Sequence, residues 1–314
     1  MPYFLKLIVP ISTAISVFTN TLLIYLIVRR SPKTLGSYKH LMIFMSVIEI
    51  LYSMVLFLVK PETKTKGHYW VIATDSKGAM VPLTMAYFLL LVYGGSFGVA
   101  LAAFGVHFVF RYLTATGSKA WVTGIKPLFV WLGIPILSGA IYICSLHACS
   151  QLNESILEFV RNEIGNAQNL PITSLLAQIA SFLVIIYFGT RTYFVIKKLS
   201  GPHRNHSSSL KQLQSQLFYS LVLQSVIPII LVNVPSNFLT AKLVSGTADY
   251  VHGYIGNVTA CIFPAIDPLP ILIIIKPYRN AIKVILRRLF RRPADSSALT
   301  TESQMFTTRK SGYG

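Results

Sequence analysis

Apolar residues occupy seven long segments of the 314-residue chain, and shorter polar stretches separate them. A helix that crosses the hydrocarbon core of a bilayer needs about 20 mostly apolar residues. Every segment reaches that length, and the third is long enough to tilt or to begin outside the membrane. The pattern therefore predicts an all-α membrane protein with a bundle of seven transmembrane helices. The predicted spans are residues 7–28, 38–59, 80–110, 125–147, 172–196, 216–239 and 250–275.

Most of the 28 Lys and Arg residues lie in alternate connections and after the last span. Cytoplasmic connections of membrane proteins carry an excess of these residues. The distribution predicts that the N-terminus lies outside and the C-terminus inside. Asn153 begins an Asn-Glu-Ser triplet in the second outer connection, so it is a candidate glycosylation site that agrees with this orientation.

Composition supports a membrane protein and argues against a nucleic-acid partner. Charged residues make up 12% of the chain and hydrophobic residues 53%, whereas soluble domains carry about 25% charged residues. The net charge is +18, but the cations cluster beside apolar segments. That placement is typical of cytoplasmic flanks rather than of a DNA-binding face.

The segment GGSFG at residues 94–98 matches the pattern of a nucleophile elbow. That motif needs a strand-to-helix turn, whereas this segment lies within a continuous apolar run. Small residues at this spacing favour close packing of two helices. The sequence contains no zinc-protease, phosphate-loop or Cys/His metal motif. We therefore expect neither enzyme activity nor a cofactor nor a metal site.

Three polar residues, Asn20, Glu49 and Asp267, fall inside predicted spans. Counting about 1.5 Å per residue from the inner boundary places Asn20 and Asp267 about 12 Å deep and Glu49 about 16 Å deep. Buried ionisable groups are costly in a membrane and usually functional. We expect an intramembrane polar cluster joined by hydrogen bonds. In the alternative, each acid separately satisfies backbone groups freed by nearby prolines.

Pro228 in the sixth span and Pro268 in the seventh predict helix kinks, because proline lacks the N–H that a helix needs. The kink at Pro228 would let the inner half of its helix pivot. A static kink is the alternative.

Basic residues also mark the inner ends of the third and seventh spans. In HFVFRYL, at residues 107–113, Arg111 either has a specific role or only extends to lipid phosphate, and His107 suits an interhelical hydrogen bond. Apolar and basic residues alternate at helical spacing over residues 277–290, which predicts a basic amphipathic helix on anionic membrane lipid. A simple positive stop is the alternative. Residues 1–290 would form one domain of seven transmembrane helices and the amphipathic helix, and residues 291–314 a disordered cytoplasmic tail.

Four ordered stretches together resemble G-protein-coupled receptors, and more closely the nematode serpentine chemoreceptors of the Str class and its Srj relatives. The similarity covers roughly residues 5–290. The stretches are LGSYKHLMIFMSVIEI at 35–50, HFVFRYL at 107–113, QLFYSLVLQSVIPIILVNVP at 216–235 and FPAIDPLPILIIIKPYR at 263–279.

The resemblance implies a chemosensory, olfactory-type receptor in the plasma membrane of sensory-neuron cilia. It would bind a small environmental molecule and signal through a heterotrimeric G protein. The triplet at 110–112 matches the place where rhodopsin-like receptors carry acid-Arg-Tyr, but Phe110 replaces the acid. The usual intrahelical salt bridge is therefore not implied. The candidate G-protein-facing residues are Arg111, Tyr112, Arg191, Lys197, Lys198 and Lys211.

The same resemblance implies a ligand site in the outer half of the bundle. Candidate pocket residues are Tyr87, Tyr93, Gln178, Asn233 and Tyr254, although ordinary helix packing is the alternative for each. The family's disulfide to the start of the third span lacks its cysteine here, so the pairing of Cys149 stays open. Two other functions stay open as well, a transporter or channel that uses the polar cluster as its path, and a membrane scaffold that does not signal.

Overall fold

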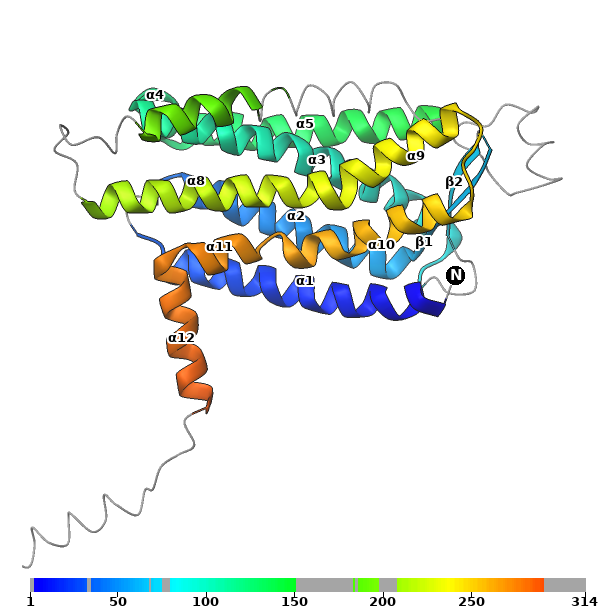
Figure 1. Ribbon diagram of the computed structural model, residues 1–314, viewed down its shortest axis with the longest axis horizontal. Helices are drawn as coiled ribbons and strands as arrows, with labels where there is room; N and C mark the ends of the chain where they lie inside the picture. The colour runs from blue at the N-terminus through cyan, green and yellow to red at the C-terminus, as the bar shows by residue number, and fades with distance from the viewer. Residues whose placement is uncertain are drawn as a thin grey trace, which may run out of the picture.

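The computed structural model describes residues 3–32, 35–67, 69–74, 80–150, 183, 186–197 and 208–290. Its long helices lie side by side and run roughly in one direction (Figure 1). They are α1 (Tyr3–Arg30), α2 (Tyr38–Val59), α3 (Leu83–Thr116), α5 (Ile125–Ser150), α8 (Ser208–Pro228), α9 (Val234–Val244), α10 (Tyr250–Ile266) and α11 (Leu269–Ile274). The short helix α4 (Lys119–Val122) joins α3 to α5.

Six helices or helix pairs in the described part of the chain are long and apolar enough to cross a membrane. The second coincides with the predicted span at 38–59, and the third begins at Leu83 rather than at 80 and continues to Thr116. The span formed by α8 and α9 covers Gln212–Val244, which is longer than the predicted 216–239. Of the predicted fifth span, residues 183 and 186–196 are described, and they are helical.

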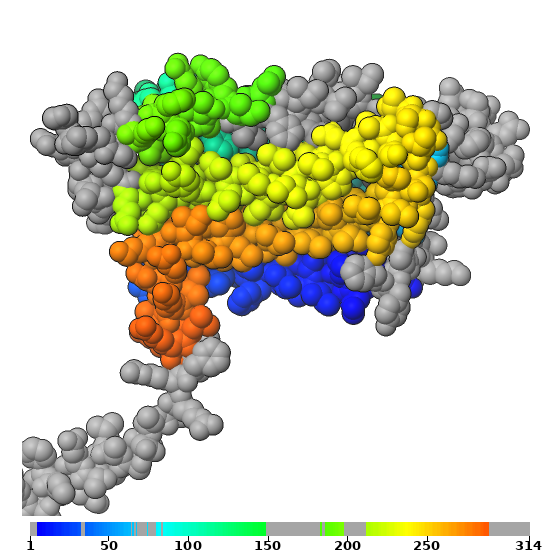
Figure 2. All heavy atoms as spheres, viewed as in Figure 1, coloured from blue at the N-terminus to red at the C-terminus, as the bar shows by residue number. Residues whose placement is uncertain are grey.

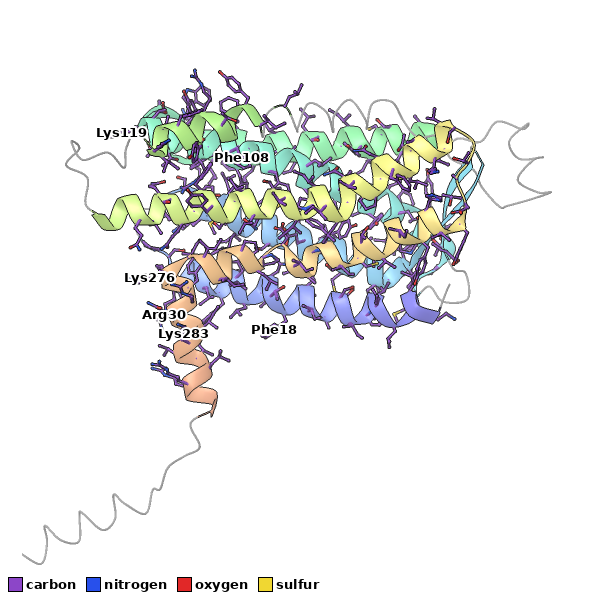
Figure 3. The ribbon with its side chains drawn as sticks, in the orientation of Figure 1. Phe18, Arg30, Phe108, Lys119, Lys276 and Lys283 are labelled. Carbon is purple, nitrogen blue, oxygen red and sulfur yellow. The ribbon has the colours of Figure 1, made fainter. Side chains whose placement is uncertain are left out.

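Side chains on the outside of the bundle suit contact with lipid. Phe18 of α1 points away from the other helices and is 67% exposed (Figure 3). Phe129 and Leu137 of α5 are similarly exposed. Apolar side chains facing outward along whole helices are unfavourable in water and favourable in hydrocarbon.

Glycines let α3 and α5 approach closely. A Cβ atom added to Gly98 would lie 2.4 Å from a ring carbon of Tyr142, and one added to Gly95 would lie 2.6 Å from Ile143. From the other side, a Cβ on Gly139 would lie 3.0 Å from the backbone oxygen of Gly95. The packing face predicted from residues 94–98 is therefore confirmed. Any larger residue here would force the helices apart.

Both predicted proline sites interrupt a helix. Pro228 ends α8, and the next residues form a π-helical turn, η2 (Ile229–Asn233), before α9 begins. Pro268 follows Asp267 in the break between α10 and α11. Both irregularities arise because proline removes one helical hydrogen bond and its ring displaces the preceding turn.

A β-hairpin closes one end of the bundle, and the hydrophobic pattern did not predict it. Strands β1 (Pro61–Lys66) and β2 (Tyr69–Thr74) pair antiparallel, with Pro61 opposite Thr74 and Lys66 opposite Tyr69. Gly67 in the turn has φ +60° and pairs with Ala248 just before α10. We call this the hairpin end.

The opposite end of the bundle is the basic end, where Arg30, Lys119 and Lys276 lie (Figure 3). Helix α12 (Lys276–Phe290) turns away from the bundle there and protrudes from its body (Figure 2). Tyr278 near its start is fully buried, and its hydroxyl is 2.7 Å from the hydroxyl of Ser31 at the end of α1. The start of α12 is therefore fixed to the bundle, while the rest of the helix projects from it.

Candidate functional site

The three polar residues singled out in the sequence lie together in the interior. Asn20 of α1 and Asp267 are fully buried, and Glu49 of α2 is 2% exposed. The side chain of Glu49 contacts the side chains of both Asp267 and Asn20. We call these three residues, with Gln224, the polar layer. The structure brings the predicted cluster together, and its role in function stays a prediction.

Gln224 of α8 is a member of the polar layer that the sequence interpretation missed. Its side-chain amide donates to Oδ2 of Asp267 at 2.9 Å and to the backbone oxygen of Asp267 at 3.1 Å. The signal was present in the sequence, because Gln224 is an amide in an apolar run four residues before Pro228. Gln224 thereby links α8 to the break between α10 and α11.

Asn20 hydrogen-bonds to backbone in two helices. Its amide donates to the backbone oxygen of Pro264 at 3.1 Å and to that of Ser16 at 3.1 Å. It therefore satisfies backbone near a proline while it also contacts Glu49. Ser53 extends the network, since its hydroxyl donates to that of Ser16 at 2.7 Å.

Three buried oxygens of the polar layer have no hydrogen-bond donor: Oδ1 of Asn20, Oε2 of Glu49 and Oδ1 of Asp267. Among the residues that the structure describes, neither acid forms an ion pair with Lys or Arg. Two buried carboxyl groups in contact repel each other when both are ionised, so at least one of them carries a proton. A cavity of about 10 Å³ adjoins them and is lined by Asn20, Glu49, Gln224 and His107 among others. It has room for about one water molecule.

Arg111 lies in the interior at the basic end of α3 and is 2% exposed. Its guanidinium carbon lies 4.7 Å from the ring centre of Tyr38 in α2. Its Nη2 donates to the backbone oxygen of Gln214 in α8 at 3.4 Å. The alternative in which Arg111 extends to lipid phosphate is wrong for this structure, because the side chain turns inward. Neighbouring Tyr38 was not singled out from the sequence.

Aromatic side chains surround this arginine. The hydroxyl of Tyr38 is 3.1 Å from Nδ1 of His107, which is the interhelical hydrogen bond expected for that histidine. Phe110, at the place of the missing acid, packs against the rings of Tyr38 at 5.6 Å and Trp131 at 6.1 Å. Phe110 is therefore part of the core.

The other predicted G-protein-facing residues differ in exposure. Tyr112 is half-buried against the ring of Phe188, with ring centres 5.6 Å apart. Arg191 and Lys197 are exposed. Lys198 lies outside the described residues, and for Lys211 only the backbone in α8 is described.

The predicted pocket residues have separate partners. Tyr93 stacks on Tyr52 with ring centres 4.8 Å apart, and Tyr254 stacks on Tyr250. The hydroxyl of Tyr87 lies 2.8 Å from Nδ1 of His147. The side-chain amide of Asn233 donates to the backbone oxygen of Pro228. Gln178 and Asn153 lie outside the described residues. The side chain of Cys149 is not described, whereas Cys144 and Cys261 are free thiols.

Uncharged hydrogen bonds hold the hairpin to α10. Thr63 donates to Oδ1 of Asn257 at 2.6 Å, and Thr65 donates to the backbone oxygen of Asp249. Gly253 allows this approach, because a Cβ there would lie 3.0 Å from the backbone oxygen of Thr63. These contacts fix the first turn of α10 beneath β1.

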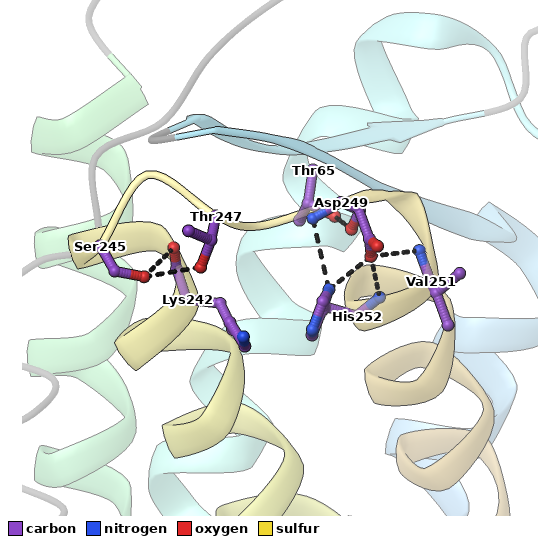
Figure 4. Close-up of polar contacts among 7 residues, drawn as sticks. All are labelled: Thr65, Lys242, Ser245, Thr247, Asp249, Val251 and His252. Atoms are coloured by element: carbon purple, nitrogen blue, oxygen red, sulfur yellow. Dashed lines mark hydrogen bonds and ion pairs between the residues drawn. The ribbon is translucent and has the colours of Figure 1, made fainter.

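Asp249 caps the N-terminus of α10 (Figure 4). Its carboxylate accepts from the backbone N–H groups of Val251 and His252 and contacts the imidazole of His252. Desolvation alone would raise the pKa of Asp249, but the hydrogen bonds from His252 and Val251 outweigh it and hold the pKa below its usual range. Within the described ranges, no three His, Cys, Asp or Glu side chains are grouped so as to hold a metal ion.

The order of helices and the inward-facing polar layer define a seven-helix receptor fold. The structure superposes on squid rhodopsin with a TM-score of 0.66 at 10% sequence identity, covering 96% of this chain and 90% of that one. The model of the serpentine type 7TM GPCR chemoreceptor Str family matches residues 5–179 and 172–283. The chain belongs to that family, and it is a multi-pass membrane protein rather than an enzyme.

Curated relatives agree with this assignment. The chain is 27% identical over 311 residues to the G-protein coupled receptor str-217 of Caenorhabditis elegans, covering 90% of each sequence. It is 24% identical over 287 residues to serpentine receptor class r-10 of the same nematode, covering 80% of this chain and 81% of the relative. The predicted resemblance to nematode receptors is confirmed.

Proposed function

We propose that this chemoreceptor binds a small environmental molecule at the hairpin end and activates a heterotrimeric G protein at the basic end. The proposal includes an outer N-terminus, display on the plasma membrane of sensory-neuron cilia, and α12 lying on the inner leaflet. Family membership supports the class of function, and the distribution of Lys and Arg supports the orientation.

One observation carries the proposal most directly. Arg111 sits at the basic end of α3, where it bridges α2 and α8, while Arg191 and Lys197 nearby in the chain's fifth helical segment are exposed. In this arrangement the arginine is withheld from the surface. A ligand that favours another arrangement of the helices would make it accessible, since a ligand shifts such an equilibrium by its differential affinity for the two states.

The polar layer does not favour a carrier. Its cavity of about 10 Å³ has room for about one water molecule. A substrate would need a far larger site, because pockets for small molecules enclose about 300–1,000 Å³. The polar layer is better suited to joining helices than to passing a solute.

The test is a screen of small molecules on cells that display the receptor, with G-protein activation as the measurement. We expect ligand-dependent activation, and its loss in Arg111→Ala at equal surface display. The control is Phe18→Ala, which truncates a side chain of α1 that points away from the other helices and is 67% exposed (Figure 3). That variant should keep its response. Uptake or current in cells without G protein would contradict the proposal.

A further inference from the structure

Within the part of the chain that the structure describes, Arg111 is a buried cation without a carboxylate partner. Its guanidinium is covered by the ring face of Tyr38 and donates to the backbone oxygen of Gln214. A cation withdrawn from water needs compensation, and the face of an aromatic ring supplies it through its negative quadrupole. The residue that precedes Arg111 is Phe110, so the adjacent position provides no charge either.

Tyr38 is held so that its face stays on the arginine. The side chain is 3% exposed, and its hydroxyl bonds to His107. The ring of Phe110 lies 5.6 Å away at an interplanar angle of 32°. The hydroxyl of Tyr38 is hydrogen-bonded to His107, and Phe110 packs beside the ring. The ring therefore cannot turn without breaking that hydrogen bond and disturbing the packing of the core.

We propose that Tyr38 is the positioning residue that keeps Arg111 withdrawn in the resting receptor. Through the guanidinium, the ring of α2 and the carbonyl of α8 hold three helices together at the basic end. Movement of α8 away from α3 breaks the bond to Gln214, after which the ring alone retains the cation. We call the contact of the Tyr38 ring with the Arg111 guanidinium the clamp. Its consequence for signalling rests on the proposed function, whereas the contact itself is a property of the helices.

The strength of the clamp should depend on the aromatic ring of Tyr38 rather than on its hydroxyl. Tyr38→Leu removes the π face, and we expect basal G-protein activation without ligand to rise about tenfold at equal surface display. Tyr38→Phe keeps the π face and loses only the bond to His107, so its rise should be less than about a third of that. Tyr142→Leu is the matched control, because it removes another buried tyrosine, in the second half of α5, away from the basic end. It should leave basal activation at the parental value.

A second measurement follows the helices without any G protein. Leu213 of α8 is 9% exposed at the basic end. In Leu213→Cys, made in a chain whose own three cysteines are replaced by serine, the rate of maleimide labelling in permeabilised membranes reports how often α8 separates from its neighbours. Tyr38→Leu added to this variant should raise the labelling rate several-fold, and Tyr38→Phe should raise it much less. A merely structural loss would instead raise labelling equally in Tyr38→Leu and Tyr142→Leu.

The two measurements separate the two proposals. Faster labelling in Tyr38→Leu with unchanged basal activation supports the clamp and contradicts coupling to the G protein tested. Unchanged labelling in Tyr38→Leu overturns the clamp, whatever happens to signalling. Equal effects of Tyr38→Phe and Tyr38→Leu overturn it too, because they would assign the effect to the hydroxyl.

Discussion

The bundle buries charge-bearing groups in two regions, and it does not pair them with each other. In the polar layer, Glu49 and Asp267 contact one another, and the Gln224 amide donates to Asp267. At the basic end, Arg111 rests on a ring and one carbonyl. His107 lies between the regions, because it lines the cavity beside Glu49 and bonds to the ring of Tyr38 that covers the arginine.

The two regions differ in what a deletion leaves behind. Removing the Asp267 carboxyl takes away one of the two acceptors of the Gln224 amide and leaves it only the backbone oxygen of Asp267, and a buried donor that loses an acceptor is costly. Removing the Arg111 charge leaves no buried polar group without a hydrogen bond. The ring of Tyr38 needs no donor, and the backbone oxygen of Gln214 lies within helix α8, where it can accept from the helix backbone. The polar layer should therefore carry stability, and the arginine should carry function at little benefit to stability.

The largest effect is expected from Asp267→Leu. It removes one acceptor of the Gln224 amide and the carboxyl that contacts Glu49, so we expect a loss of about 2–3 kcal/mol. In detergent this should lower the unfolding temperature by roughly 5–10 °C. Asp267→Asn is the control, because its amide oxygen still accepts from Gln224, and it should lose less than half as much. Equal losses in the two variants would show that the bond to Gln224 is unimportant.

A smaller effect of opposite sign is expected from Arg111→Met. Methionine keeps most of the volume and removes a buried cation, so stability should stay the same or rise by up to about 1 kcal/mol. The unfolding temperature checks this in the same detergent. A fall as large as that of Asp267→Leu would contradict the difference drawn between the regions.

The smallest effect is expected at Asp249, an exposed carboxylate outside both regions. Its folded pKa lies below its unfolded value of about 3.9, so its charge stabilises the protein above that value and the contribution disappears as the pH falls through the folded pKa. Asp249→Asn keeps an acceptor for the cap and removes only the charge. At about pH 6 it should unfold roughly 1–3 °C lower than the parent, and the difference should narrow as the pH falls below the usual pKa of an aspartate through the folded pKa of Asp249. A difference independent of pH would assign the effect to something other than the charge.

The positions of the helices, the depth of the polar residues and the helix interruptions could be predicted from the sequence, because a bilayer of known thickness requires apolar segments of a certain length. Span length fixed where helices occur, and depth counting placed Asn20, Glu49 and Asp267 at similar levels. The prolines at 228 and 268 marked the interruptions that the structure contains. Each of these inferences needs only the chain's own spacing and the thickness of a bilayer.

Other features depend on which helices become neighbours, and local pattern does not encode that. Gln224 and Tyr38 are ordinary residues of apolar runs until α8 reaches α10 and α2 reaches α3. The hairpin lies in a connection whose residues alternate weakly, and its pairing with α10 is a long-range contact. Arg111 was expected among surface contacts because arginines at helix ends usually extend to water or phosphate. Its inward position depends on an aromatic partner from another helix.

The glycine contact between α3 and α5 has a mechanical consequence. Because side chains of α5 pack directly on the glycine backbone of α3, little space is left between the two helices, and we expect them to move together. Helix α3 has 34 residues and is therefore about 51 Å long. It carries Tyr93 in its first half and Arg111 near its basic end. We therefore expect a tilt of α3 near Tyr93 to move the arginine as well, and to move α5 with it.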